Sequence, residues 1–175
     1  MSEVFSPMGL CNLWVLFAIT AAGVTDLRWG KVYNLVTIPA LAAGLTLNTL
    51  AGGWSGLFFS LQGLGLGLAL LLTALLFGQY LGGGDVKLVA ALGALRGPTF
   101  VLATLAVAIP LGGVIAIVYA LSRGVLRDSL RRLGWTLYGR FVLGDTGPPE
   151  AGASLKFPYA LALAGGALAA LWWRP

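Results

Sequence analysis

Long apolar runs separated by short polar breaks make up most of this chain. Each break holds charged residues or a cluster of Gly and Pro, and most of the runs approach the 20 or so helical residues that cross the hydrocarbon core of a bilayer. We therefore predict an all-α, polytopic membrane protein folded as a single domain over residues 1–175. The predicted spans, about six in number, are residues 10–25, 34–50, 57–80, 86–96, 99–121 and 155–173.

Some of the breaks carry local signals. Asn34 stands where it can cap the second span, and Gly52-Gly53 is typical of a turn. The fourth run, closed by Arg96-Gly97-Pro98, is short for a span, so we expect it to be tilted, buried within protein or extended by flanking residues.

The segment 122–154 is the long polar interruption, and we predict it to be a cytoplasmic loop. Within it, residues 122 to about 142 are predicted to form a helix with arginines on one face and an apolar stripe on the other, made of Leu126, Leu130, Leu133, Leu137 and Phe141 at helical spacing. Such a basic amphipathic helix is expected to lie in the membrane interface against anionic lipid headgroups. Docking of a partner protein is the alternative interpretation.

Composition agrees with a membrane setting: 58% of the residues are hydrophobic and 10% are charged, against about 25% charged in an average soluble domain. The chain has no histidine, which excludes Ser-His-Asp and Cys-His catalysis and histidine metal ligands. One cysteine, Cys11, excludes a disulfide within the chain and is interpreted as a small packing residue. Acid–base chemistry must come from carboxylates, Lys or Tyr.

The positive charges predict the orientation. If six spans start with the N-terminus outside, all of the eleven Lys and Arg except Arg96 and Arg174 fall on the cytoplasmic side. That bias follows the positive-inside rule, so we predict that both termini are non-cytoplasmic.

Two of the six acidic residues stand apart from the rest. Asp26 and Asp85 lie at span boundaries, and the intervening pair of spans returns the chain to the same face, whereas the other four lie in the N-terminal tail, the amphipathic helix or the loop. Two carboxylates that share a low-dielectric site can share a proton, so that one acts as base on a water and the other as acid toward a scissile carbonyl. The alternatives are helix capping or pairing with neighbouring cations. The glycines at 82–84 predict either a close backbone approach or a plain turn.

These segments resemble a known family. The segment GGGDVKL at residues 82–88 is similar to the GxGDxK signature of the prepilin peptidase (type IV leader peptidase) family of GxGD membrane aspartyl proteases. Asp26, followed by basic residues and Asn34, resembles that family's first catalytic segment, although Val32-Tyr33 stands in place of Ile-Pro. Residues 156–159, KFPY, resemble the start of its last span.

The resemblance implies an aspartic endopeptidase of a prokaryotic cytoplasmic (inner) membrane, multi-pass and with its site facing the cytoplasm. It would remove the leader from prepilin-like precursors that have a basic leader and an apolar helix, with no cofactor, metal or nucleic acid. The implied catalytic residues are Asp26 and Asp85, with Gly82, Gly83 and Gly84 shaping the site. Further candidates for substrate binding or for tuning of the carboxylates are Arg28, Lys31, Asn34, Lys87, Pro158 and Tyr159.

The chain lacks the paired CxxC motifs of the bifunctional members, which also N-methylate their products. It resembles instead the short, peptidase-only members of tight-adherence (Flp) pilus systems. Two alternatives from other classes stay open: a small proton- or cation-coupled transporter that uses the same two aspartates, and a docking subunit of a secretion machine.

Overall fold

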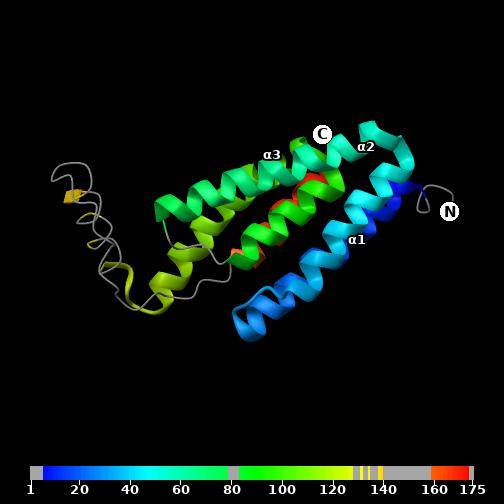
Figure 1. Ribbon diagram of the computed structural model, residues 1–175. Coiled ribbons are helices and arrows are strands. Elements are labelled where there is room, and N and C mark those ends of the chain that lie inside the picture. Colours follow the sequence, from blue (N-terminus) through cyan, green and yellow to red (C-terminus); the bar gives the residue numbers. More distant parts are fainter. Residues whose placement is uncertain are drawn as a thin grey trace. The chain divides into compact units, whose positions relative to one another are not determined.

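The computed structural model describes residues 6–78, 83–127 and 159–173, together with residues 131, 134, 138 and 139. The four helices of the described residues are α1 (Pro7–Trp29), α2 (Asn34–Gly78), α3 (Gly83–Ser122) and α5 (Tyr159–Trp173), shown in Figure 1. The predicted all-α class is confirmed for this part of the chain.

The chain divides into two compact units, one of Met1–Gly112 with Pro158–Pro175 and the other of Gly113–Phe157. Both predicted aspartates belong to the first unit. The single domain over residues 1–175 stays a prediction.

Local sequence signals set the ends of α1. Ser6 caps its first turn by accepting a hydrogen bond from Gly9 N–H at 3.1 Å, and Pro7 occupies the first helical position. At the other end, Gly30 adopts the left-handed conformation, and its N–H donates to the main-chain oxygen of Asp26 at 2.7 Å. The helix therefore extends one turn beyond the predicted end at residue 25, and Asp26 lies in its last turn.

Two glycines interrupt the long helices α2 and α3. Gly53 (φ 58°, ψ −134°) divides α2, and Gly97 (φ 80°, ψ −177°) divides α3, both with non-helical backbone. Both interruptions fall where the sequence predicts breaks between spans.

The count of about six spans is not confirmed. Among the described residues, three helices are long and apolar enough to cross a membrane: Pro7–Trp29, Asn34–Leu70 and Gly83–Ser122. The shorter apolar helix α5 has 15 residues. The counts differ because α2 and α3 each run as one long helix across the interruption at Gly53 or Gly97, where the sequence predicts two separate spans.

Close backbone contacts define the course of the helices in the first unit. A Cβ on Gly44 would lie 2.6 Å from the carbonyl carbon of Ala94, so the first half of α2 packs against the first half of α3. In the second half of α2, a Cβ on Gly63 would run into the carbonyl of Gly93. Residues 83–96 of α3 thus lie against both halves of α2.

A polar cluster closes this packing at the interruption of α3. Pro98 has no N–H, so the carbonyl of Ala94, four residues earlier, lacks its helical donor. Asn48 Nδ2 lies 3.1 Å from that carbonyl oxygen, and Ser60 Oγ donates to it at 2.7 Å. Side chains from both halves of α2 therefore satisfy the carbonyl that the proline leaves free.

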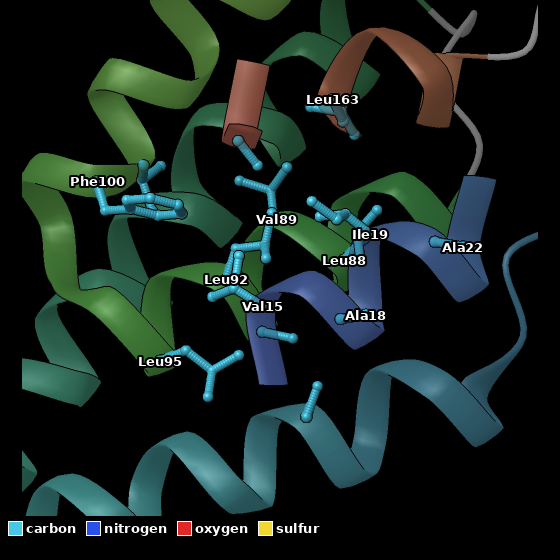
Figure 2. Packing of buried hydrophobic residues seen from close by; sticks show 14 of the residues in the cluster. Val15, Ala18, Ile19, Ala22, Leu88, Val89, Leu92, Leu95, Phe100 and Leu163 are labelled. Atoms are coloured by element: carbon cyan, nitrogen blue, oxygen red, sulfur yellow. The ribbon is translucent and has the colours of Figure 1, made fainter. Parts of the chain in front are cut away.

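The core joins all four helices. Figure 2 shows Val15 and Ile19 of α1, Leu88 and Leu92 of α3, and Leu163 of α5 packed together, each no more than 2% exposed. Helix α1 contacts both α2 and α5, and α1 and α2 form the hairpin seen in Figure 1.

Large apolar side chains also lie on the outside of the helices. Leu35, Trp54 and Trp172 are 85%, 77% and 92% exposed. A soluble monomer rarely exposes apolar surface on this scale, whereas helices facing lipid do so. The described helices are therefore those of a membrane protein.

In the second unit, α3 ends in a Schellman motif: Gly124 (φ 67°) donates to Leu121 O, and Val125 donates to Ala120 O. Ser122 is therefore the last residue of α3, not the first of the predicted amphipathic helix. Most of that helix, and most of the predicted loop 122–154, lies outside the described residues.

Candidate functional site

One end of the helices in the first unit brings together the chemistry-bearing residues that the sequence singled out. Here α1 ends at Trp29, and α2, α3 and α5 begin at Asn34, Gly83 and Tyr159. We call it the aspartate end, because Asp26 and Asp85 lie in the last turn of α1 and the first turn of α3.

Asp26 is half-buried and bonds to a helix from the far end of the chain. Its Oδ2 accepts a hydrogen bond from the backbone N–H of Ala160, in the first turn of α5, at 3.2 Å. The N–H groups of a first helical turn have no partner within their own helix, so the Asp26 carboxylate satisfies one of them. In the same contact, a Cβ on Gly23 would lie 3.9 Å from the Leu161 side chain.

Asp85 is 8% exposed and stands directly after a glycine that permits a close approach. A Cβ on Gly84 would lie 2.8 Å from Val32 Cβ and 3.0 Å from Val32 O, so no larger residue fits there without a shift. A Cβ on Gly83 would meet nothing within 4 Å. The start of α3 therefore packs closely against the connector between α1 and α2, residues 30–33.

A second contact joins the same two segments. Lys87 Nζ donates to Asn34 Oδ1 at 2.9 Å, across more than fifty positions of sequence. The Asn34 side chain was expected to cap α2. In the structure α2 begins at Asn34 itself, and Tyr33 O accepts from Val36 N–H in the first turn.

Tyr159 connects α5 to the second aspartate. Its phenol interacts electrostatically with Asp85, and its ring is seated on α3, where a Cβ on Gly112 would lie 3.2 Å from Tyr159 Cε2. The next residue, Ala160, donates its N–H to Asp26. The first turn of α5 therefore interacts with both aspartates, through Ala160 with Asp26 and through Tyr159 with Asp85.

Four further predicted site residues make no described contact with an aspartate or lie outside the described residues. Arg28 and Lys31 are exposed at the aspartate end, and the structure brings neither into a described contact with an aspartate. Gly82 and Pro158 lie outside the described residues. No group of three or more Cys, Asp or Glu side chains that could hold a metal ion is found in the described part of the chain.

Sequence reasoning missed the participation of Val32, Gly112 and Ala160. Each takes part through its backbone or through the absence of a side chain, so residue chemistry gives no signal for it. Two carboxylates at one end of an apolar bundle can exchange protons, bind a cation or activate a water molecule.

Comparison with known proteins identifies the family of this chain. Residues 13–117, which include both aspartates, match the model of the type IV leader peptidase family. No curated protein and no solved structure matches the chain. The transporter alternative gains no support from these comparisons, and the expected tight-adherence, peptidase-only subtype stays a prediction.

Proposed function

Since this chain belongs to the type IV leader peptidase family, we propose that it cleaves prepilin-like precursors as an aspartic endopeptidase, with Asp26 and Asp85 as its catalytic pair. The observation that carries the proposal is that two neighbouring residues in the first turn of α5 interact with the two carboxylates, Ala160 with Asp26 and Tyr159 with Asp85. This arrangement supports one site shared by residues that lie far apart in the sequence.

The pair works as an acid and a base. One carboxylate, ionised, takes a proton from a water molecule while the water oxygen attacks the scissile carbonyl carbon, and the other, protonated, donates its proton to the carbonyl oxygen. When the gem-diol intermediate collapses, the C–N bond breaks, the amine nitrogen accepts the proton held by the first carboxylate, and a hydroxyl of the gem-diol returns a proton to the second. The products are a leader with a new carboxylate and a pilin with a free amino terminus.

In the proposed mechanism the two aspartates share one proton, so the protonation state belongs to the pair and not to either residue. Asp85 is the more buried of the two, whereas Asp26 has one oxygen, Oδ2, engaged by Ala160. Oδ1 of Asp26 is then the oxygen on which a water molecule can be held.

We propose that the enzyme spans the cytoplasmic membrane six times. Helix α2 has 45 residues, about 68 Å at 1.5 Å per residue, which is twice the roughly 30 Å of the hydrocarbon core. A fold back at Gly53 makes each half about as long as a span, and the contact between Gly63 and Gly93 supports that fold. The same argument applies to α3 at Gly97.

In this arrangement the aspartate end faces the cytoplasm. Arg28, Lys31 and Lys87 all lie at this end, as the positive-inside rule requires. A prepilin-like precursor would approach laterally, its apolar helix in the bilayer and its basic leader in the cytosol, where water reaches the carboxylates.

The test is cleavage of a prepilin-like precursor in membranes by wild type, Asp26→Asn and Asp85→Asn. Asn keeps the size of the side chain but cannot take up or release the proton, so each variant should lose activity by about 10²- to 10⁴-fold. Asp145→Asn, which changes an acid of the predicted loop 122–154, is the matched control and should cleave normally. Full cleavage by either of the first two variants at equal protein levels would refute the proposed pair.

A further inference from the structure

Two contacts hold the start of α3 to the segment that follows Asp26. Gly84 is seated on Val32 of the connector, and Lys87 bonds to Asn34 at the first residue of α2. They flank Asp85 in the sequence, one residue before it and two residues after it. The position of Asp85 is therefore fixed on both sides against the chain that carries Asp26.

The geometry of a helix limits what Lys87 does. Residues two apart in an α-helix point about 200° from one another, so they do not share a face. Asp85 and Lys87 both lie in the first turns of α3, Asp85 buried and Lys87 exposed. The ammonium group is thus directed at Asn34 on α2 and not at the neighbouring carboxylate.

We propose that Lys87 and Asn34 are positioning residues, whose hydrogen bond, the Asn34–Lys87 tie, sets Asp85 at its working distance from Asp26. This rests on the proposed function of the aspartates. It replaces the two roles expected for Lys87 from the sequence, a direct effect on Asp85 and the binding of a substrate carboxylate.

We expect the Asn34–Lys87 tie to affect the position of Asp85 more than the stability of the fold. Both side chains are exposed, and a single exposed hydrogen bond adds little to the stability of the fold. A displacement of about 1 Å between reacting groups, in contrast, lowers a rate by about a hundredfold. Breaking the tie should accordingly slow the reaction while the protein stays folded.

The experiment is a double-mutant cycle on kcat and KM for a prepilin-like substrate, with Lys87→Met, Asn34→Ala and the double variant. We expect each single variant to lower kcat by about 10- to 100-fold with KM unchanged. The double variant should be no worse than either single variant, because the same bond is lost in all three. Thermal unfolding of each variant should stay near that of the wild type.

Conservative variants provide the rescue. Lys87→Arg keeps a cationic donor and Asn34→Asp keeps an oxygen acceptor, so each should retain most of the activity that Lys87→Met and Asn34→Ala lose. Arg123→Met removes an exposed cation at the end of α3 that lies over the Tyr119 ring, and it controls for a general loss of positive charge.

Two outcomes would overturn the tie. If Lys87→Met raises KM while Asn34→Ala behaves as wild type, Lys87 binds substrate. If the two effects multiply in the double variant, the residues act independently. Failure of the tie is distinguishable from failure of the proposed function, because in the first case Asp26→Asn and Asp85→Asn are still inactive, and in the second they are not.

Discussion

Gly83 and Gly84 are neighbours in the sequence, and only the second has a close contact at the position of a missing side chain. The sequence treats them as equivalent members of a glycine run before Asp85, whereas in the structure a Cβ on Gly84 would meet the backbone and side chain of Val32. A Cβ on Gly83 meets nothing within 4 Å. Of these two glycines, only Gly84 therefore has a steric reason to lack a side chain; the site-shaping role of the glycines stays a prediction.

This difference predicts opposite effects of the same substitution. Gly84→Ala should force α3 away from the connector, with a cost of about 1–3 kcal/mol in stability and a clear loss of cleavage. Gly83→Ala, the matched control, should leave both unchanged or raise stability by at most about 1 kcal/mol, since Ala favours helix. Thermal unfolding and the cleavage rate measure the two effects, and equal behaviour of the two variants would contradict the contact.

Tyr159 provides a second prediction at the scale of single atoms. Tyr159→Phe removes only the hydroxyl that interacts with Asp85 and leaves the ring on Gly112. The loss of this polar neighbour of Asp85 should lower the cleavage rate by about two- to tenfold, which corresponds to roughly 0.4–1.4 kcal/mol in activation free energy, with folding intact. Tyr119→Phe, far along α3, is the control, and a wild-type rate in Tyr159→Phe would remove the phenol from the site.

At the scale of single residues, the sequence predicts which side chains are candidates for the site, but it does not predict the contacts made by backbone atoms. Asp26 and Asp85 are identified by a charge at a span boundary. The sequence gives no comparable signal for the N–H of Ala160, because every residue except proline has a backbone N–H. It gives none for Val32 either, because most residues could occupy the connector. The sequence predicts Lys87 as a candidate, but its hydrogen bond to Asn34 depends on how α2 and α3 pack, which one sequence does not state.

Among the elements, α2 and α3 show how local signals and tertiary contacts cooperate. The breaks at Gly53 and Gly97 are predicted from glycine and proline alone. The side chains that complete the second break are not, since Asn48 and Ser60 look like ordinary polar residues of apolar runs. Their function appears once both halves of α2 are placed beside the carbonyls of Ala94 and Leu95.

Asn48 is therefore expected to hold these elements together. Its Nδ2 lies within 3.2 Å of four oxygens: Gly44 O, Ser60 Oγ, Ala94 O and Leu95 O. Asn48→Leu keeps the approximate size and removes the donor that these oxygens share, leaving Ser60 Oγ as the remaining side-chain donor to Gly44 O and Ala94 O, so it should lower stability by about 1–3 kcal/mol. Thermal unfolding in detergent checks this.

The control for that substitution is Thr46→Val on the same helix. The Thr46 hydroxyl is exposed and bonds within its own helix, to Ala42 O at 2.8 Å and to Ala43 O at 3.2 Å. Its loss should change stability by less than 0.5 kcal/mol or so. A similar effect in both variants would show that the contacts between the elements add nothing.

For the whole molecule, the proposed six spans make a prediction about sidedness. The connector after α1 and the turn at Gly53 should lie on opposite faces of the membrane. Lys31 and Ser55 are exposed at these two places, and the sole cysteine, Cys11, is 2% exposed. In a Cys11→Ala background, Lys31→Cys should react with an impermeant maleimide from the cytoplasmic side and Ser55→Cys from the other side.

Labelling of both cysteines from one face would mean that residues 34–52 do not cross the bilayer. Such a result would refute the six-span arrangement while leaving the chemistry of Asp26 and Asp85 to be tested by cleavage.

The meeting of helix starts at the aspartate end has an electrostatic consequence. Peptide dipoles give the first turn of a helix roughly half a positive charge, which stabilises a nearby anion by about 0.3–1 kcal/mol. Asp85 lies in the first turn of α3, and Asp26 accepts from the first turn of α5. Asp85 thus has the dipole of its own helix as a fixed counter-charge, which no single side-chain substitution removes. For Asp26, the positive start of α5 offsets the negative end of α1, in whose last turn it lies.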